Sequence, residues 1–370
     1  MPGRASSPKE KENKLDRTES LFKEITEAPG VPGYEAEVRA IIRRHLEKLT
    51  TIEQDKIGSI ICRKDGQAQQ PRVMLASHMD EIGFMVRHIT DEGFIKFVPL
   101  GGWWDQVMLA QRVIIRTSQG DMVGVLGAKP PHLLSSEERK KVVEKKDMYV
   151  DIGATSKEEV EKAGVRLGDP IVPISPFTVL ANSRTYLGKA WDDRIGCALF
   201  IETIQELAKA EHPNTVYAVG TVQEEVGLRG AKTSAYMVEP DVALILESDI
   251  PGDVPGIKPE ESAVKLGKGP TLALYDARMI PNLKLRDLVI ALAEELEIPL
   301  QFSVIEDGAT DGGIIHIHNE GVPTIVIAVP ARHIHSHTAI LHRDDYDNAL
   351  KLVVALVKRL DEATVRDLTA

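Results

Sequence analysis

The sequence has few cysteines and no long apolar run. Only Cys62 and Cys197 occur in 370 residues, so a disulfide framework is excluded, and we expect two small buried hydrophobic residues in a reducing compartment. No apolar run reaches the roughly 18 residues that cross a bilayer. The N-terminal stretch also lacks the apolar segment of a secretory signal. We therefore expect a cytoplasmic protein with no membrane partner.

Basic residues are also scarce relative to acidic ones. Lys and Arg number 45 against 56 Asp and Glu, which gives a formal net charge of -11. Proteins that bind nucleic acids present a basic face, so we expect no nucleic-acid partner. Hydrophobic residues make up 43% of the chain, enough for a sizeable core, and the length favours two domains.

The pattern of apolar residues changes twice along the chain. The first and last parts alternate amphipathic stretches with apolar runs such as "RVMLAS" and "DVALIL", which indicates helices around a largely parallel sheet. Short strand-like runs between them indicate a small β-barrel or sandwich. We predict an α/β fold, with a mixed, mostly parallel sheet sandwiched by helices and an inserted small β-barrel or PDZ-like domain. The predicted parts are a flexible tail at 1–17, a main domain at 18–85 and 181–370, and the insertion at 86–180.

Polar residues follow the apolar runs that we interpret as strands. In an open α/β sheet the carboxyl ends of the strands meet at one edge, where ligands bind. Imidazole and carboxylate groups without thiolate suit zinc, cobalt or manganese, and carboxylates can bridge two ions. The candidate residues, in chain order, are His78, Asp80, Asp192, Asp193, Glu224, Glu225, Glu247, Asp249, His333, His335 and His337.

The adjacent pair Glu224 and Glu225 follows the apolar run "TVYAVGTV". Adjacent residues that leave a strand point in different directions. One glutamate can therefore bind a metal while its neighbour acts as a general base on a water molecule. A divalent cation would remove the repulsion between the two carboxylates.

Five segments of the chain resemble the metal-site segments of one known family. They are "ASHMDEIGFMV", "GKAWDDRIGCAL", "TVQEEVGLRGA", "LESDIPGDVPG" and "ARHIHSHTA". In order and spacing they are similar to those of the M42 aminopeptidases, the tetrahedral (TET) enzymes and their glutamyl aminopeptidase relatives. The resemblance runs from about residue 18 to 360.

This resemblance implies a role for each matching residue. It implies that two divalent ions per subunit, zinc or cobalt and possibly manganese, are bound. Glu224 would be the general base, and Asp80 would hold the second ring nitrogen of the first histidine ligand. A cis peptide bond between Asp192 and Asp193 is expected. The implied ligands are His78 and Glu247 for one ion, Glu225 and His335 for the other, and Asp192 as the bridge.

The sequence departs from the family pattern in three places. The family often has aspartate at the position of Glu247, so Asp249 competes for this role. The segment "HSHTA" replaces the usual "HSP", and we interpret His333 and His337 as residues outside the ligand set. The segment "GATDGG" resembles the family's "TDAG" loop, whose Thr310 and Asp311 we do not expect to contact substrate.

The resemblance implies an aminopeptidase that releases N-terminal residues from peptides by metal-assisted hydrolysis. It also implies a homo-oligomer, a tetrahedral dodecamer built from dimers, with the insertion as the contact. The alternatives are another metallohydrolase, such as a deacylase or a carboxypeptidase-like enzyme, and an inactive scaffold. The sequence leaves the native metal and the preferred N-terminal residue open.

Overall fold

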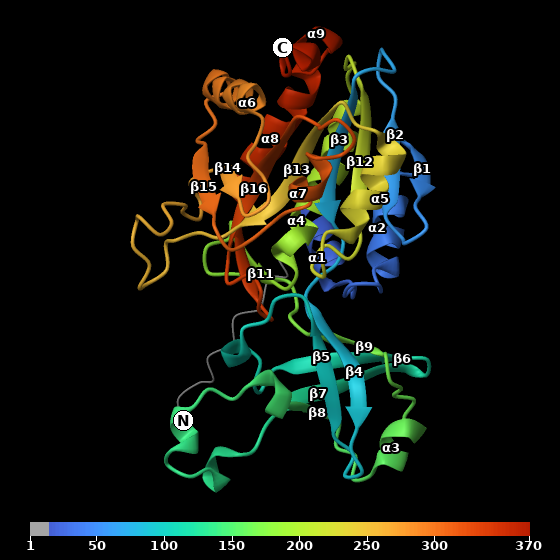
Figure 1. The fold of residues 1–370 in the computed structure, drawn as a ribbon, viewed down its shortest axis with the longest axis vertical. Helices are drawn as coiled ribbons and strands as arrows, with labels where there is room; N and C mark the ends of the chain where they lie inside the picture. Colours follow the sequence, from blue (N-terminus) through green and yellow to red (C-terminus); the bar gives the residue numbers. More distant parts are fainter. Residues whose placement is uncertain (1–14) are drawn as a thin grey trace, which may run out of the picture.

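A computed structural model describes residues 15–370, so most of the expected tail at 1–17 lies outside the described residues. The first helix, α1 (Arg17–Glu27), begins after Asp16, whose side chain accepts a hydrogen bond from the amide of Glu19. Figure 1 shows two parts, a large sheet with its helices and a smaller barrel beneath it. Among the described residues, no helix is long and apolar enough to cross a membrane.

The large part is built on an eleven-stranded mixed sheet. Its centre consists of four parallel strands, which are apolar and almost wholly buried, as strands covered on both faces must be. The flanking strands add antiparallel pairs. The central strands are β12 (Thr215–Thr221), β3 (Arg72–His78), β13 (Val242–Asp249) and β16 (Thr324–Arg332). The flanking strands are β1 (Thr51–Gln54), β2 (Ile60–Lys64), β17 (Ala339–His342), β11 (Thr185–Gly188), β10 (Thr178–Val179), β14 (Thr271–Asp276) and β15 (Gln301–Ile305).

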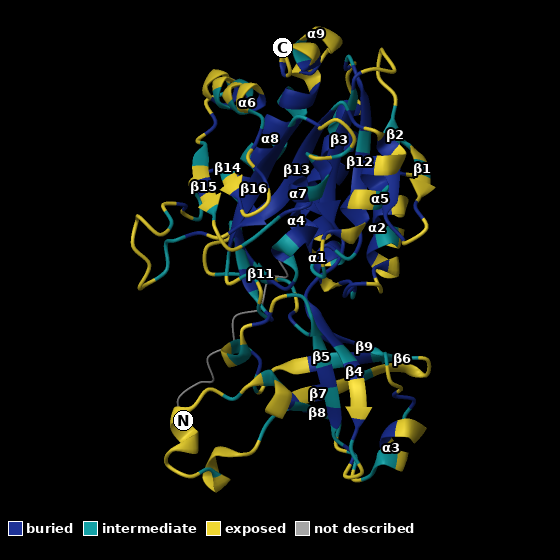
Figure 2. Cartoon of the chain, in the orientation of Figure 1, coloured by how far each residue is buried: buried dark blue, intermediate teal, exposed yellow. Residues whose placement is uncertain are grey.

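Helices cover both faces of this sheet and bury its apolar side chains (Figure 2). One face packs against α1, α2 (Ala36–Leu46), α4 (Trp191–Leu207), α6 (Leu283–Glu295), α8 (Arg343–Arg359) and α9 (Glu362–Asp367). The other face packs against α5 (Arg229–Val238) and α7 (Gly312–Ile315). The predicted fold class, a mixed sheet sandwiched by helices with an inserted barrel, is confirmed.

The smaller part is a closed barrel in which every strand pair is antiparallel. Its own apolar core contains Phe84, Phe97 and Trp103. The short helix α3 (Lys157–Lys162) precedes the last strand. The barrel strands are β4 (Gly83–Ile89), β5 (Ile95–Leu100), β6 (Arg112–Thr117), β7 (Gly120–Gly127), β8 (Tyr149–Asp151) and β9 (Pro170–Pro173). Because β4 follows β3 after only residues 79–82, the barrel is joined to the sheet beside the carboxyl end of β3.

Candidate metal centre

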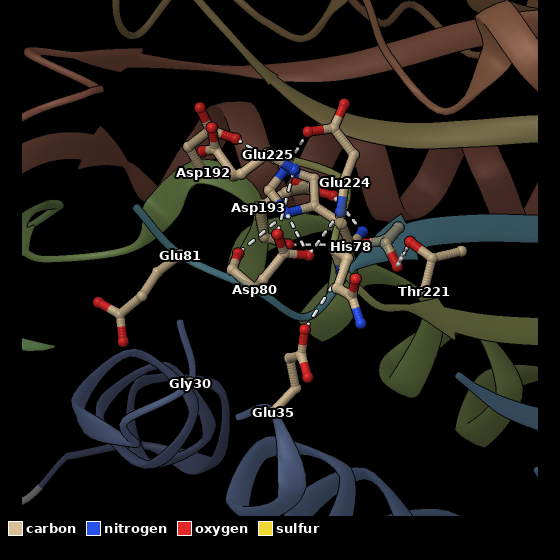
Figure 3. A network of polar contacts seen from close by, with 12 residues as sticks. Gly30, Glu35, His78, Asp80, Glu81, Asp192, Asp193, Thr221, Glu224 and Glu225 are labelled. Carbon is tan, nitrogen blue, oxygen red and sulfur yellow. Dashed lines mark hydrogen bonds and ion pairs between the residues drawn. The ribbon is translucent and has the colours of Figure 1, made fainter. Parts of the chain in front are cut away.

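The structure brings all of the proposed ligands together at the carboxyl edge of the central strands. Figure 3 shows three of them, His78, Asp192 and Glu225, close to one another. His78 ends β3, and Glu247 lies near the end of β13. Glu225 follows β12, and His335 lies in the turn after β16. Asp192 enters from the first turn of α4. Four separate chain segments and one helix start therefore supply one cluster.

Asp192 lies between two histidines. Its Oδ1 is 3.1 Å from Nε2 of His78, and its Oδ2 is 3.2 Å from Nε2 of His335. Nε2 of His78 is 3.9 Å from Oε1 of Glu247, and Nε2 of His335 is 3.9 Å from Oε1 of Glu225. Each oxygen of Asp192 thus faces a different histidine–glutamate pair, which is the arrangement of a carboxylate shared by two sites.

Both imidazole rings are oriented through their second nitrogen. Nδ1 of His78 lies 2.9 Å from the backbone carbonyl oxygen of Asp80, whereas the Asp80 carboxylate is 3.7 Å away. The nearer partner of the ring is thus the backbone of Asp80, and the two carboxylate oxygens of Asp80 accept hydrogen bonds from the amides of Glu224 and Glu225 at 3.0 and 3.1 Å. Asp80 thus fixes the turn that carries both glutamates.

The ring of His335 is held from the barrel. Its Nδ1 lies 2.7 Å from the carbonyl oxygen of Gly102, in the segment that follows β5. The next residue, Trp103, stacks on Phe84 of the barrel core. Its ring also packs against that of His337, with the two ring centroids 5.0 Å apart. Sequence reasoning missed this contact, because a backbone carbonyl is present in every residue and no side chain marks it.

Asp193 lies behind the cluster and organises the first turn of α4. It is fully buried, and its carboxylate accepts hydrogen bonds from the hydroxyl of Ser77 at 2.5 Å and the amide of Gly196 at 3.1 Å. One of its oxygens also lies within 4.8 Å of ligand atoms of His78 and Glu247. The peptide bond between Asp192 and Asp193 is cis, as expected.

A buried ion cluster, which sequence reasoning also missed, lies beside the centre. Nζ of Lys189 is 2.5 Å from Oε1 of Glu81, and Nη2 of Arg194 is 3.4 Å from the same oxygen. Arg194 also donates to the carbonyl of Ile25 in the last turn of α1 and to that of Ala28 just after this helix. This cluster joins the start of α4, which carries Asp192, to the segment that follows His78.

The other sequence candidates lie outside the ligand cluster. His337 is buried against Trp103, and His333 has a left-handed backbone conformation in the same turn. Asp311 lies behind the site, where it accepts a hydrogen bond from Thr221 at 2.5 Å. Thr310 lines the cavity in front of the centre.

The electrostatics of the centre call for a cation. Burial raises the pKa of Glu224 and Glu247 well above their ordinary value, and neighbouring carboxylates add to this effect. Burial and Asp192 raise the pKa of Glu225 to about 7. Burial also acts to raise the pKa of Asp192, but hydrogen bonds from His335 and His78 outweigh it and hold that pKa below its ordinary value. Closely spaced buried acids are costly to ionise together unless a positive charge is bound among them.

The donor set fits divalent metal ions. It offers imidazole nitrogens and carboxylate oxygens, which zinc, cobalt and manganese accept. Cys197 is buried nearby, but its sulfur hydrogen-bonds with Ser77 and the carbonyl of His78. The centre opens into a cavity of about 1240 Å³, which is large enough for part of a peptide.

Comparisons with known proteins identify the family. The model of the M42 glutamyl aminopeptidase family matches residues 58–352. The chain is 42% identical to a putative aminopeptidase, FrvX, of Escherichia coli over 335 residues, which cover 90% of this chain and 93% of that protein.

Solved structures agree with the family match. The fold superposes on a TET aminopeptidase from a marine sediment archaeon of the Thaumarchaeota with a TM-score of 0.94. The two sequences are 51% identical, and the match covers 95% of this chain and 99% of the other. The TM-score is 0.84 with the TET1 peptidase of Pyrococcus horikoshii, which is 35% identical, over 93% and 100% of the two chains. That peptidase can assemble into a tetrahedron or a large octahedral shell. The family match covers most of the chain. The chain therefore belongs to the M42 aminopeptidase family, so it is a hydrolase that uses divalent metal.

Proposed function

We propose that the protein releases N-terminal residues from peptides with two divalent metal ions bound in the cluster described above. The observation that carries this proposal is the position of Asp192, whose two oxygens lie 3.1 and 3.2 Å from two different histidines. The proposed ligands are His78 and Glu247 for one ion, Glu225 and His335 for the other, and Asp192 for both. Zinc or cobalt is the proposed metal, with manganese also compatible with the donors.

Glu224 is the proposed general base. Its carboxylate lines the cavity and lies 4.0 Å from Nε2 of His78, while its backbone is fixed by Asp80. Bound divalent ions would lower the pKa of a water molecule and polarise the scissile carbonyl. Glu224 would take the proton of that water and pass it to the leaving amine, a role that its raised pKa suits. The buried carboxylates would also attract the free amine at the start of a peptide.

Substitution of Glu224 tests this assignment. We expect Glu224→Gln to retain both metal ions and lower kcat by about 10²- to 10⁴-fold, the usual contribution of a general base. The assay is release of p-nitroaniline from aminoacyl substrates with added Co²⁺ or Zn²⁺, beside N-acetylated substrates that an aminopeptidase leaves intact. Glu294→Gln, on the exposed face of α6, is the matched control. Unchanged turnover of Glu224→Gln would exclude Glu224 as the base.

We propose that the chain assembles into a tetrahedral dodecamer built from dimers. The assembly of the Pyrococcus horikoshii relative supports this proposal. In the proposed dodecamer of this chain, residues 18–85 and 181–370 form the catalytic domain, and residues 86–180 provide the contact between subunits. The barrel exposes apolar side chains, including Val125, Leu133 and Leu167. Light scattering coupled to gel filtration measures the mass, and a monomer at micromolar concentration would contradict the proposal. The cytoplasmic location stays a prediction.

A further inference from the structure

A buried carboxylate from a distant part of the chain, that of Glu35, reaches the turn that carries the two glutamates. Glu35 precedes the first turn of α2 and is 3% exposed. Its Oε1 accepts hydrogen bonds from the amide of Gln223 at 3.1 Å and from the amide of Gly33 at 2.7 Å. In Figure 3 its side chain extends from the start of α2 toward the cluster. Glu35 therefore holds the backbone of the residue next to Glu224.

The side chain of Glu35 does not cap its own helix. Residues at this position often accept a hydrogen bond from a free amide in the first turn of the helix that they begin, but Glu35 makes no such bond. Burial raises the pKa of Glu35 to about 7, and the nearby carboxylate of Asp80 adds to this effect, whereas the amides of Gly33 and Gln223 oppose it. A second buried acid beside Asp80 is costly. A role in starting α2 therefore does not account for the position of this carboxylate.

Two carboxylates hold three successive amides of the turn. Glu35 accepts a hydrogen bond from the amide of Gln223, and Asp80 accepts hydrogen bonds from the amides of Glu224 and Glu225. The carbonyls of Gln223 and Glu224 instead accept hydrogen bonds from amides later in the same loop. Gln223 also has a left-handed backbone conformation, with φ at 56°, which residues other than glycine adopt only when surrounding contacts hold them there. Glu35 supplies such a contact at this residue.

Glu35 acts from outside the cavity. Glu224 lines the cavity, whereas Glu35 is not among the lining residues. Glu35 therefore reaches the reaction only through the backbone of the turn. A general base must lie within hydrogen-bond reach of the proton that it takes, and a displacement of about 1 Å can lower a rate about 10²-fold.

We propose that Glu35 is a positioning residue that acts through the amide of Gln223 to fix the direction in which Glu224 leaves the turn after β12. The proposal rests on the proposed function, because Glu224 needs this orientation only if it is the general base. Asp80 binds the amides of both glutamates, so it affects the base and a proposed metal ligand together. Glu35 binds the amide on the far side of Glu224 from Glu225, so its loss should affect kcat more than metal binding.

Three substitutions of Glu35 separate the loss of this contact from the loss of charge. Glu35→Met removes the acceptor from a side chain of similar length, and Glu35→Gln retains a carbonyl oxygen as the acceptor. Glu35→Asp retains the charge but is one methylene shorter, which withdraws the carboxylate from the amide of Gln223. Aspartate is also a favoured residue at the start of a helix, so this variant tests the contact even if the methionine variant does not fold.

The assay is release of p-nitroaniline from aminoacyl substrates with added Co²⁺ or Zn²⁺, with metal content measured for every protein. We expect Glu35→Met and Glu35→Asp to lower kcat by about 10- to 100-fold, to change KM less than threefold and to retain both metal ions. Glu35→Gln should restore kcat to within threefold of the wild type. Glu47→Met, at the exposed end of α2, is the matched control and should change none of these values.

A double substitution tests whether Glu35 acts through Glu224. Once the proposed base is removed, Glu35 has no base to position, so Glu35→Met should lower the residual kcat of Glu224→Gln by less than threefold. An equal loss in the wild-type and Glu224→Gln backgrounds would indicate a general structural role and would overturn the proposal.

The remaining outcomes separate this proposal from the proposed function. No release by the wild type with added metal would refute the aminopeptidase, and unchanged turnover of Glu224→Gln would refute the base, in each case with the positioning role. An active wild type and an impaired Glu224→Gln, beside full activity of Glu35→Met and Glu35→Asp, would overturn the positioning role alone. Loss of a metal ion from the Glu35 variants would place the effect on Glu225 and would also overturn it.

Discussion

We expect acid to destabilise this protein through His337. This residue is 2% exposed, and its ring packs against Trp103. Neither ring nitrogen has a hydrogen-bond partner among residues 15–370. Burial lowers the pKa of His337 from 6.5 to about 4. The folded protein therefore holds this imidazole neutral at a pH where the unfolded chain binds a proton.

The size of the effect follows from this pKa difference. Between pH 6.5 and 4 the unfolded chain binds the proton more tightly, so the free energy of unfolding decreases as the pH falls through this window. Above pH 6.5 the imidazole is neutral in both states and the stability contribution is fully present. With a folded pKa of about 4, the loss is about 2 kcal/mol at pH 5.

The variant His337→Phe tests this reasoning. Phenylalanine retains a ring against Trp103 and cannot take up a proton, and no hydrogen bond is lost. Urea denaturation of chelator-treated wild type and variant at pH 8 and pH 5 gives the two free energies of unfolding. Between these pH values, the wild type should lose about 2 kcal/mol more than the variant.

A control and a refuting result complete the test. His132 is exposed on the barrel, so His132→Gln should show the same pH dependence as the wild type. If His337→Phe and the wild type lose equal stability between pH 8 and pH 5, the imidazole is protonated or hydrogen-bonded in the folded protein and the reasoning fails.

Three further substitutions test the architecture of the centre. Asp192→Asn should weaken the binding of both metal ions, as measured by metal content after dialysis, and retention of two ions per chain would place the bridge elsewhere. Gly101→Ala would put a methyl group 2.8 Å from Oε2 of Glu225, so we expect metal loss and lower activity; Gly153→Ala has a similar positive φ with open space around it and should retain the metal. Glu81→Gln leaves two buried cations without their carboxylate and should lower the free energy of unfolding by about 3–5 kcal/mol in urea denaturation, whereas the same change at an exposed glutamate of α6 should cost less than about 1 kcal/mol.

The main features of the centre could be predicted from the sequence. Apolar runs mark the central strands. The polar residues at the carboxyl ends of these strands, such as His78 and Glu225, lie at the same edge of the sheet because parallel strands run in the same direction. The identity of these side chains also restricts the chemistry to imidazole and carboxylate donors. Both inferences need only local information, since a strand and the residue after it are neighbours in the chain.

The contacts around the centre could not be predicted in the same way. His335 and Gly102 are 233 positions apart, and the contacting atom of Gly102 is a backbone carbonyl that every residue possesses. Asp80 was expected to hold a histidine with its carboxylate, whereas the contacts of that carboxylate with the amides of the glutamate turn were not predicted. Which of several reachable donors an acid pairs with depends on how distant segments approach one another.

The sequence by itself determined the α/β class, the inserted barrel and the candidate side chains of the proposed metal centre, because hydrophobic periodicity and side-chain chemistry are properties of short stretches of chain. Only the tertiary structure placed the barrel loop against His335 and buried His337 on Trp103. These features arise from packing between segments that are far apart in sequence, where burial and partner geometry decide what each polar group can do.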